Sequence, residues 1–318
     1  MSLFPSTFEN IQKAALLLKE AELVAFPTET VYGLGADAFQ DKACQKIYTL
    51  KGRPTFNPLI VHCFDKEQAE GLAFFGKEAQ KLADQFWPGP LTLVLKKKKT
   101  SPLSEIVTAG LETVALRVPL HATARALLKA FGRPIAAPSA NRSGFLSPTR
   151  AHHVLEDFQS KLSMVLDSSP IEVGLESTIL DLSEETPILL REGGLEKEKI
   201  EACLGQKISK LQKVSKITAP GQLLRHYAPR LPLRLNVENV NPNEGLLAFG
   251  KPLLGYKVSF NLSETESLEE AAQNLFAFLH LLDRQKDITG IAVQSIPEQG
   301  LGQAINDRLR RAAEGSKH

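Results

Sequence analysis

Residues 47–62, IYTLKGRPTFNPLIVH, lead from the end of a predicted helix into a predicted buried strand. Apolar residues have helical spacing over 41–50, whereas 59–63 is a short apolar run that follows the turn residues Asn57 and Pro58. Segments of both kinds alternate through the first two thirds of the chain. Strands and helices that interleave in this way predict an α/β domain.

The other predicted elements of this domain are also short apolar runs or segments with helical apolar spacing. Ser6 and Glu9 are expected to form a capping box at the first helix. Strands are predicted at 23–26, 59–63, 91–95, 114–118, 135–138, 164–167 and 177–182, and helices at 6–20, 41–50, 122–130 and 149–156.

The composition changes after residue 204. Residues 205–230 are polar and basic, and TAPGQLLRHYAPR contains two prolines and a glycine, which indicates a linker with little core of its own. A strand at 245–250, a helix at 267–283, a strand at 288–293 and a helix at 303–313 are predicted to follow. We therefore expect a large α/β domain at 1–204, a linker at 205–235 and a small α/β domain at 236–318.

Composition excludes several classes of protein. The 318 residues carry a net charge of +2, too small to predict nucleic-acid binding from charge alone. Cys44, Cys63 and Cys203 form no CxxC motif, which fits a reducing cytoplasm and excludes a structural zinc site built on cysteine. His152 and His153 have no acidic partners at ligand spacing, so no metal site is predicted. No apolar run is long enough to span a bilayer, and the N-terminal residues resemble a helix rather than a signal peptide.

Lys51-Gly52-Arg53-Pro54 is the first candidate binding motif. Glycine between the two cations lets a backbone approach a ligand, and proline fixes the turn that aims them. A planar arginine fork beside the point charge of a lysine suits phosphate oxygens. The alternative is a solvated basic turn after a helix.

Thr28, Glu29 and Thr30 form the second candidate, directly after the predicted strand at 23–26. Hydroxyls at the carboxyl end of a strand in an α/β sheet face the usual ligand crevice. The alternative is a hydroxyl cap on the next helix. The segment GLGADA only approximates the dinucleotide-binding fingerprint and follows a predicted loop, so we assign no nucleotide site to its glycines.

The third candidate is the segment 136–149, AAPSANRSGFLSPT. Ser139 and Asn141 follow a predicted strand, and Ser143 and Ser147 extend the polar loop. So many small donors after a strand would suit the phosphates and sugar of a nucleotide. The alternative is an ordinary turn rich in serine, asparagine and proline.

Single polar residues in strands complete the candidates. Arg117 interrupts the apolar strand at 114–118, so its charge is either buried and paired or directed into a site. Ser177 begins a predicted strand and Arg191 ends one, where polar residues are ordinary. The lysines of 96–99 are expected at a solvated hairpin tip, with RNA contact as the alternative.

The order of these motifs is more specific than any one of them. PTETVYGLG, KGRP…NPL…H, LRVP, APSANRSG…SPT, ESTI and LREG follow the motif series of the YrdC-like domain. With RHYAP and the C-terminal GLGQAINDRLRRAA, the chain resembles the family of long, two-domain threonylcarbamoyl-AMP synthases from about residue 6 to 315. The resemblance implies a YrdC-like twisted open sheet with flanking helices, and a small Rossmann-like α/β domain at the C-terminal end.

The resemblance also implies an activity. The family forms L-threonylcarbamoyladenylate and pyrophosphate from L-threonine, bicarbonate or CO₂, and ATP, and a separate transferase uses the product to make N6-threonylcarbamoyladenosine in tRNA. We expect the same nucleotidyltransferase reaction here, in the cytoplasm, with at most weak RNA contact. We expect Mg²⁺ to be carried in with ATP, because the sequence has no carboxylate cluster for a dedicated metal.

Site residues are assigned by the same resemblance. Lys51, Arg53, Ser139 and Asn141 would surround the phosphates as the catalytic group. Arg117 would bind the carboxylate of L-threonine, and small hydroxyls would recognise its β-hydroxyl. In full, the ATP contacts would be Lys51, Arg53, Asn57, Thr113, Ser139, Asn141, Ser147, Arg191, His226 and Tyr227, and the threonine contacts Thr30, His62, Arg117, Ala137 and Ser177.

Arg225, His226 and Tyr227 are expected to cover the nucleotide as a lid, unless they serve to dock the small domain onto the large one. Two other functions stay open. A double-stranded RNA-binding module without adenylyl transfer would show steep salt dependence, but the balanced charge disfavours it. Carbamoyl transfer in hydrogenase maturation would need acylphosphatase-like and zinc-finger segments, which this sequence lacks.

Overall fold

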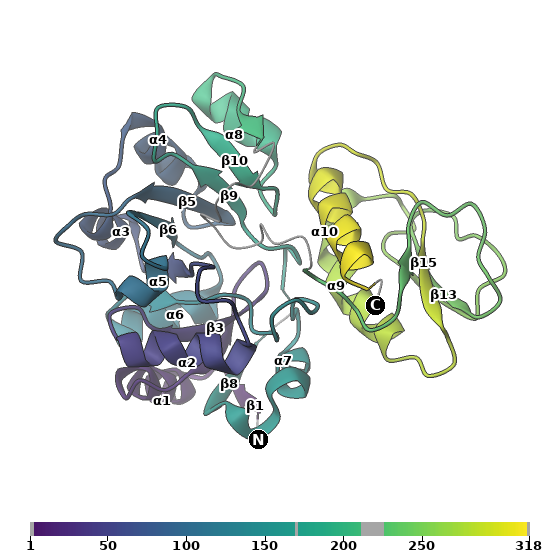
Figure 1. The fold of residues 1–318 in the computed structure, drawn as a ribbon, viewed down its shortest axis with the longest axis horizontal. Helices are drawn as coiled ribbons and strands as arrows, with labels where there is room; N and C mark the ends of the chain where they lie inside the picture. Colours follow the sequence, from purple (N-terminus) through teal and green to yellow (C-terminus); the bar gives the residue numbers. More distant parts are fainter. Residues whose placement is uncertain (1–2, 169–170, 211–225, 317–318) are drawn as a thin grey trace.

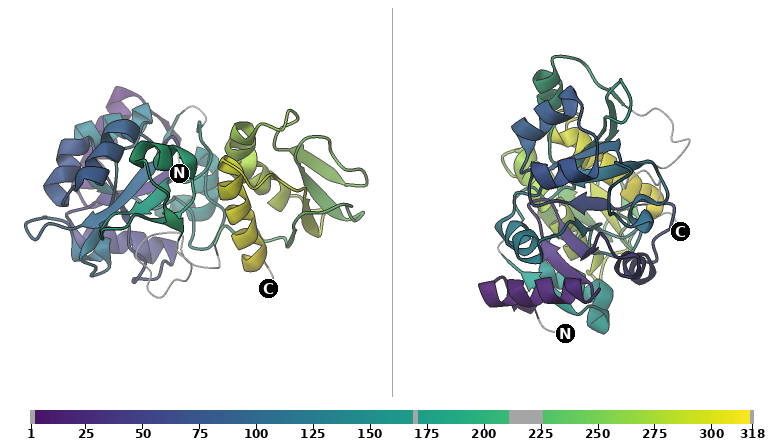
Figure 2. Two further views of the ribbon diagram at one scale, coloured as in Figure 1. Left: turned by 90° about the horizontal axis from the view of Figure 1, so that it is seen from above. Right: turned by 90° about the vertical axis from the view of Figure 1, so that its left-hand side faces the viewer.

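The computed structural model describes residues 3–168, 171–210 and 226–316. They form a large α/β unit on one mixed sheet and a small α/β unit at the C-terminal end (Figure 1). The two long helices of the small unit lie on the side of its sheet that faces the large unit, in the first view and in the view from above (Figure 2).

The large sheet mixes parallel and antiparallel strand pairs. Its strand order is β1-β8-β2-β3-β7-β4-β6-β5-β9-β10-β11. The strands are β1 (Leu3–Pro5), β2 (Val24–Pro27), β3 (Tyr32–Asp37), β4 (Ile60–His62), β5 (Leu91–Lys96), β6 (Thr113–Arg117), β7 (Ile135–Ala136), β8 (Met164–Asp167), β9 (Thr178–Asp181), β10 (Ile188–Arg191) and β11 (Ser209–Lys210).

Helices flank both faces of this sheet. They are α1 (Phe8–Lys19), α2 (Asp41–Lys51), α3 (Lys66–Leu72), α4 (Lys77–Phe86), α5 (Glu105–Thr108), α6 (Ala122–Phe131), α7 (Ala151–Phe158) and α8 (Lys197–Leu204), with a 3₁₀ turn at Gln159–Lys161. Helices α1 and α6 pack together over one face near β2, and α2 lies against β3.

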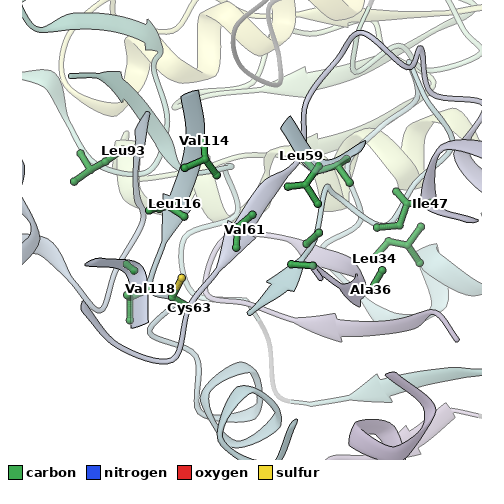
Figure 3. Close-up of a cluster of buried hydrophobic side chains, with 14 of the residues drawn as sticks. Leu34, Ala36, Ile47, Leu59, Val61, Cys63, Leu93, Val114, Leu116 and Val118 are labelled. Atoms are coloured by element: carbon green, nitrogen blue, oxygen red, sulfur yellow. The ribbon is translucent and has the colours of Figure 1, made fainter. Parts of the chain in front are cut away.

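Side chains alternate between two hydrophobic cores along the strands, as the period of two requires. On β2, Val24 and Phe26 belong to the core under α1 and α6, and Ala25 belongs to the larger core on the other face. On β4 and β6, Val61 and Leu116 also lie in the larger core (Figure 3). Their strand neighbours therefore face the opposite side of the sheet.

The small unit has a four-stranded parallel sheet of order β12-β15-β13-β14. Its elements are β12 (Leu233–Arg234), β13 (Glu244–Ala248), β14 (Val258–Asn261), α9 (Leu268–Asp283), β15 (Gly290–Val293) and α10 (Leu301–Gly315). The hydroxyl of Ser267 caps α9 by accepting from Glu270 N. The all-parallel sheet, with α9 joining β14 to β15, agrees with the predicted small α/β domain, although among the described residues no helix lies between β12 and β13 or between β13 and β14.

The two units share apolar contacts. Val31, Leu146 and Leu175 of the large unit lie in the same hydrophobic cluster as the core of the small unit. Gly174 approaches α9 so closely that a Cβ there would lie 2.4 Å from Ala272 O. A side chain at position 174 would push the units apart, so this glycine sets the close approach.

The α/β class and the two-unit architecture were predictable, but several details were not. Strand β3 was not predicted. Gly33 and Gly35 lie in it, and position 35 requires glycine because a Cβ there would come within 2.8 Å of the Phe26 ring. The predicted capping box is also wrong. Thr7 caps α1 by accepting from Asn10 N, whereas the Ser6 hydroxyl donates to Asp167 O.

The predicted linker contains a short strand near each of its ends. β11 extends the large sheet beyond residue 204, and β12 enters the small sheet before residue 236. Two-residue edge strands with polar or basic residues carry no periodic signal, which explains why they were missed. The rest of the predicted linker, residues 211–225, lies outside the described residues.

Candidate active site

Polar side chains collect on the face of the sheet opposite the core of Figure 3. Strands β4 and β6 are parallel, and their register pairs His62 with Arg117. Because Val61 and Leu116 lie in the core, His62 and Arg117 face the other side. The side chains of these two buried polar residues, on neighbouring strands, thus point to the same face of the sheet.

A β-bulge brings Arg191 to the same face. On β10, Leu189 pairs with Leu180 in the main core, and the register then shifts so that Arg191 pairs with Ile179. Ile179 belongs to the small apolar cluster on the opposite face. The extra residue therefore turns a cation toward the polar side, a common use of bulges next to active sites.

These side chains line one cavity, in which polar and charged groups converge as they do in small-molecule sites. The structure brings ten predicted residues to its wall: Thr30, Arg53, His62, Arg117, Ala137, Ser139, Ser177, Arg191, His226 and Tyr227. Five others do not line it: Lys51, Asn57, Thr113, Asn141 and Ser147. Of these five, Lys51, Asn57 and Ser147 are hydrogen-bonded to residues of the wall, namely Ser139, Arg53 and Glu176. Asn141 O accepts from Lys51, and Thr113 pairs with Lys96 at the start of β6.

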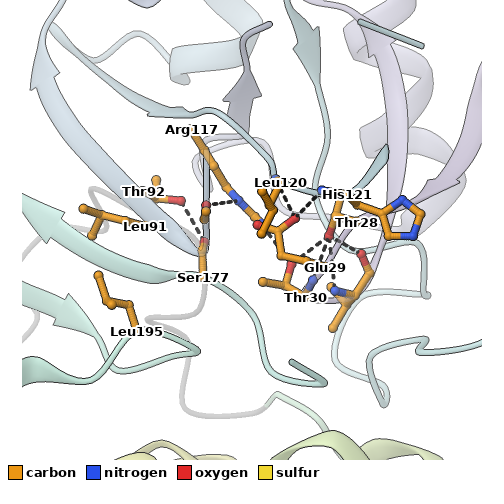
Figure 4. Close-up of polar contacts among 12 residues, drawn as sticks. Thr28, Glu29, Thr30, Leu91, Thr92, Arg117, Leu120, His121, Ser177 and Leu195 are labelled. Carbon is orange, nitrogen blue, oxygen red and sulfur yellow. Dashed lines mark hydrogen bonds and ion pairs between the residues drawn. The ribbon is translucent and has the colours of Figure 1, made fainter. Parts of the chain in front are cut away.

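One side of the cavity is organised by a buried ion pair. Arg117 Nη2 donates to Glu29 Oε1 at 2.6 Å, and Arg117 Nη1 donates to the Thr30 hydroxyl at 3.0 Å (Figure 4). The other Glu29 oxygen accepts from the backbone N–H groups of Leu120 and His121. Glu29 is thereby fully bonded and holds the guanidinium in place.

Ser177 and Arg191 form the adjoining wall. The Ser177 hydroxyl lies 2.7 Å from Thr92 Oγ1 and accepts from Arg191 Nη2 at 3.2 Å. Arg191 also donates to Ser177 O from Nε and Nη2. The turn after Arg191 packs on this segment, and a Cβ at Gly193 would lie 2.3 Å from Glu176 O, so only glycine fits there.

Lys51 is buried and its ammonium is bonded to the loop at 139–141. Nζ donates to Ser139 O at 2.6 Å and also to Asn141 O. Burial, with the nearby charge of Arg53, holds the pKa of Lys51 well below its usual range. Gly52 ends α2 with φ +62°, a left-handed conformation that glycine adopts without strain. Lys51 therefore supports the loop rather than lining the cavity.

Arg53 is also buried, which contradicts the alternative of a solvated basic turn. Its Nη2 donates to Asn57 Oδ1 and to Pro58 O, both at 2.7 Å, and its Nε donates to Asn57 O. Burial lowers the pKa of Arg53 to about 10, so the guanidinium is cationic at neutral pH. This places a fixed positive charge at the cavity wall.

Buried polar atoms without a hydrogen-bond partner among the described residues concentrate at predicted site residues. They include His62 Nδ1, Asn141 Oδ1, His226 Nδ1 and Tyr227 OH. Such atoms are costly unless something binds them. Burial also lowers the pKa of His62 and His226 to about 3, so both imidazoles are neutral and can donate or accept. The wall is thus prepared for polar ligand contacts.

His226 and Tyr227 reach the cavity from the chain that enters the small unit. Their rings meet edge to face with centroids 3.9 Å apart. Tyr227 has φ +62° and is almost fully buried, with its ring 5.6 Å from that of Phe276 in α9. Tyr227 therefore touches both the cavity and the core of the small unit. Arg225, the third predicted member of the lid, lies outside the described residues.

Two buried carboxylates had no predicted role: Glu29, which was named only as part of the second candidate motif, and Glu176, which was not singled out. Both lie within the quoted motifs PTET and EST, next to assigned residues, but nothing in a single sequence distinguishes a buried acid from a solvated one. Glu176 lines the cavity and accepts from the Ser147 hydroxyl through one oxygen. Burial opposes its ionisation, but Arg308 and Arg191 hold the pKa of Glu176 at about 2.

Residues for a dedicated metal ion do not gather here. Within 3–168, 171–210 and 226–316 no group of three or more His, Cys, Asp or Glu residues could hold a metal. Over the same ranges no helix has the length and apolar character needed to cross a membrane.

Known proteins match this chain along most of its length. A family model described as telomere recombination (Sua5_yciO_yrdC) matches residues 16–193, and one described as threonylcarbamoyl-AMP synthase, C-terminal domain, matches 195–314. A threonylcarbamoyl-AMP synthase of Pyrococcus abyssi is 44% identical, over 96% of this chain and 94% of its own. One of Bacillus subtilis is 42% identical, with coverage of 96% and 93%.

Solved structures match in the same way. P. abyssi Sua5 complexed with L-threonine superposes with a TM-score of 0.90 at 41% identity, over 98% of this chain and 96% of that one. A variant of the same protein, with a histidine and the adjoining tyrosine changed to alanine, has a TM-score of 0.87 at 39% identity, with coverage of 98% and 94%.

Proposed function

The chain belongs to the threonylcarbamoyl-AMP synthase family, and we propose that it forms threonylcarbamoyl-AMP and pyrophosphate from L-threonine, bicarbonate or CO₂, and ATP in the cavity lined by the large unit and by His226 and Tyr227. One observation carries this proposal: unpartnered buried polar atoms and fixed cations meet at a single cavity whose wall holds ten residues expected from the family motifs. Enzymes of this kind are nucleotidyltransferases.

The reaction needs no nucleophilic side chain. The amine of L-threonine attacks the carbon of CO₂ and loses a proton to solvent, which gives a carbamate. A carbamate oxygen then attacks the α-phosphorus of ATP, and the bond from that phosphorus to the bridging oxygen breaks as pyrophosphate leaves. Negative charge moves among phosphate and carboxylate oxygens, so fixed donors and position supply the catalysis.

We assign L-threonine to the side of the cavity near Arg117. Three of the five guanidinium N–H groups bond to Gly89 O, Thr30 and Glu29, which leaves one N–H on each terminal nitrogen for a carboxylate. The hydroxyls of Thr30 and Ser177 are held by arginines at fixed positions, where they can meet the β-hydroxyl of the substrate. His62, neutral at working pH, is a further polar contact.

We assign the ATP phosphates to the side near Arg53 and Ser139. Arg53 supplies positive charge, and the loop at 139–141, fixed by Lys51, supplies small donors. His226 Nδ1 and Tyr227 OH have no partner among the described residues and would face the nucleotide, and Asn141 Oδ1, also without a partner there, would need a shift of its loop to reach it. We place Asn57 and Ser147 behind this wall, and the assignment of Thr113 to ATP rests on the family resemblance alone.

His226 and Tyr227 are proposed as a lid over the nucleotide. They are the only His-Tyr pair in the sequence, and they cover the same cavity wall as Arg53 and Arg191. A closed cover would exclude water, which could otherwise hydrolyse the mixed anhydride product.

Mg²⁺ is proposed to enter with ATP. Of the described residues that line the cavity, Glu176 alone has a carboxylate, and its two oxygens are bonded to Ser147 and Arg308. Phosphate oxygens and retained waters would therefore supply the ligands that this ion prefers, and the ion would neutralise charge on the departing pyrophosphate.

The remaining assignments concern partners and location. We propose that the product passes to a separate tRNA threonylcarbamoyl transferase, because it is a reactive anhydride, and that any RNA contact is weak at a net charge of +2. A cytoplasmic location is proposed from the cysteines, which are all unpaired.

Pyrophosphate release from ATP tests the proposed reaction. The enzyme should release pyrophosphate only when L-threonine and bicarbonate are both present, and a threonylcarbamoyl adenylate should be detectable by mass spectrometry. Pyrophosphate release at the same rate with and without L-threonine would reject the assignment. RNA binding that falls steeply with salt, without any such release, would instead favour an RNA-binding module.

A further inference from the structure

Arg308 on α10 is a fully buried cation that reaches from the small unit to Glu176 and Tyr227, two residues of the cavity wall. It is the largest of the fully buried side chains, with a relative exposure of 0%. A buried charge is costly unless it is paired, so its partners indicate what it does. Those partners lie in the large unit and in the proposed lid.

The guanidinium joins the two segments that carry Ser177 and Arg191. Nε donates to Glu176 Oε2 at 2.8 Å, and Nη2 donates to Glu192 O at 2.8 Å. Each partner is the direct neighbour of a residue in the cavity wall. Arg308 therefore fixes the spacing of these segments from the small unit, through bonds that a lysine could not make together because it lacks the planar fork.

The same guanidinium lies against the lid. Its Cζ is 5.0 Å from the centre of the Tyr227 ring, within the range of a cation–π contact. Nη1 is bonded to Asp307 Oδ2, which orients the plane of the group. Because Tyr227 has a left-handed backbone conformation that is unfavourable for a tyrosine, outside contacts must stabilise it. Arg308 and Phe276, both from the small unit, provide such contacts.

We propose that Arg308 is a positioning residue for the synthase reaction, through which the small unit holds Tyr227 and Glu176 in the geometry that binds the nucleotide. Glu176 in turn accepts from Ser147, so the contacts run from α10 through one carboxylate to the loop of the third motif. This gives the small unit a defined role, which is to complete the cavity. The inference rests on the proposed lid function of Tyr227.

A kinetic cycle on the full-length enzyme tests this proposal. The variants are Arg308→Met, Tyr227→Ala and the two combined, with Arg310→Met as the control, because Arg310 lies on the same helix but is 54% exposed and pairs with Glu298. The Michaelis constants for ATP and for L-threonine are measured separately, and circular dichroism and the melting temperature report on folding.

We expect each single change at 308 or 227 to raise KM for ATP by about tenfold, and the combination to raise it little further, because both act through one contact. KM for L-threonine should change much less, and Arg310→Met should behave as wild type. If Arg308 were only structural, its loss would lower the melting temperature without raising KM for ATP more than KM for L-threonine.

The possible failures are distinguishable. If Tyr227→Ala leaves KM for ATP unchanged, the lid function is wrong and the inference falls with it. If Tyr227→Ala raises KM for ATP but Arg308→Met does not, the lid function is supported and the role of Arg308 is overturned. The same conclusion follows if the double variant raises KM for ATP by the product of the two single effects. Should Arg308→Met fail to fold, it is combined with Glu176→Gln, which removes both charges of the pair, and Glu176→Gln alone becomes the reference.

Discussion

Arg117 and Glu29 form a buried ion pair in which Nη2 and Oε1 lie 2.6 Å apart. Their side chains are 4% and 2% exposed, so water screens the pair little. Glu29 does not line the cavity itself, and Arg117 does. The carboxylate therefore acts on a substrate only through the arginine that it orients.

Glu29→Gln should raise KM for L-threonine by roughly tenfold, because a neutral amide orients the guanidinium less strongly. It should also lower the free energy of unfolding by about 3 kcal/mol, since removal of one partner leaves a buried charge unpaired. Steady-state kinetics and urea unfolding measure the two effects, and Glu185→Gln, at an exposed position, is the control. An unchanged KM in a destabilised protein would mean that Glu29 serves folding alone.

Arg53→Lys should reduce kcat/KM for pyrophosphate release by roughly 100-fold, because lysine keeps the charge but not the fork that places it. An Arg53→Ala change with little loss of folding would be expected of an exposed cation, but Arg53 is buried and bonded to Asn57 and Pro58. We therefore expect Arg53→Lys to cost about 1–3 kcal/mol of stability as well. Wild-type kinetics in the folded variant would show that Arg53 is structural.

The contrast between Arg53 and Lys51 shows what a sequence conveys about such a site. The Lys-Gly-Arg-Pro motif predicted two cations held in a stiff turn, and both are present. Burial and partners were not predictable, because the loop at 139–141 that binds Lys51 is distant in the chain, and the turn that brings nearby Asn57 back onto Arg53 has no sequence signal of its own. A sequence pattern thus identified the residues of the site more readily than their roles.

The same holds for the fold. Apolar strands such as 164–167 were predicted with their observed bounds, because burial of a whole strand leaves an uninterrupted apolar run. The glycine-containing strand β3 was missed. Glycine is required at position 35 because the Phe26 ring of the neighbouring strand leaves no room for a side chain, and this contact is not visible in the sequence. The roles of Glu29 and Arg308 were not predicted for a similar reason: the burial of a charged residue depends on partners distant in the chain, here Arg117 for Glu29 and Glu176 for Arg308.

Substrate selectivity should depend on the β-hydroxyl of L-threonine. Serine lacks a methyl group and should be disfavoured only about 10- to 200-fold, whereas 2-aminobutyrate, without the hydroxyl, should leave Thr30 or Ser177 unpaired and be rejected more strongly. The three values of kcat/KM measure this, and Ser177→Ala should narrow the gap between threonine and 2-aminobutyrate. Equal values for those two substrates in the wild-type enzyme would exclude recognition of the hydroxyl.

His226→Ala should weaken ATP binding by roughly five- to tenfold, the value of one ordinary hydrogen bond. It should leave the two units docked, because His226, unlike Tyr227, is not part of the hydrophobic cluster shared with the small unit. Titration calorimetry measures the affinity, and small-angle scattering reports on docking. Unchanged affinity for ATP with separated units would mean that this segment only docks the small unit.

The contact between the two units should weaken in acid. His153 on α7 stacks on His280 on α9, with ring centroids 3.8 Å apart and an angle of 19° between the rings. Thr149 N donates to His153 Nδ1, and His280 Nε2 lies 3.2 Å from Ser147 O. Burial lowers the pKa of His280 to about 4, and burial with the adjacent His280 lowers that of His153 further.

The sign of the pH effect follows from these shifts. The unfolded chain, in which histidine has a pKa near 6.5, binds more protons than the folded protein between about pH 6.5 and 4. Stability is therefore complete above pH 6.5 and falls toward pH 4, by up to about 1.4 kcal/mol per pH unit for each histidine that stays neutral when folded. His280→Gln keeps a donor for Ser147 O but does not titrate. Its free energy of unfolding should therefore fall less steeply with decreasing pH than that of wild type, by the slope that one histidine contributes. Urea unfolding at a series of pH values from 4 to 7 measures both slopes, and equal slopes would show that the stacked pair does not control this pH dependence.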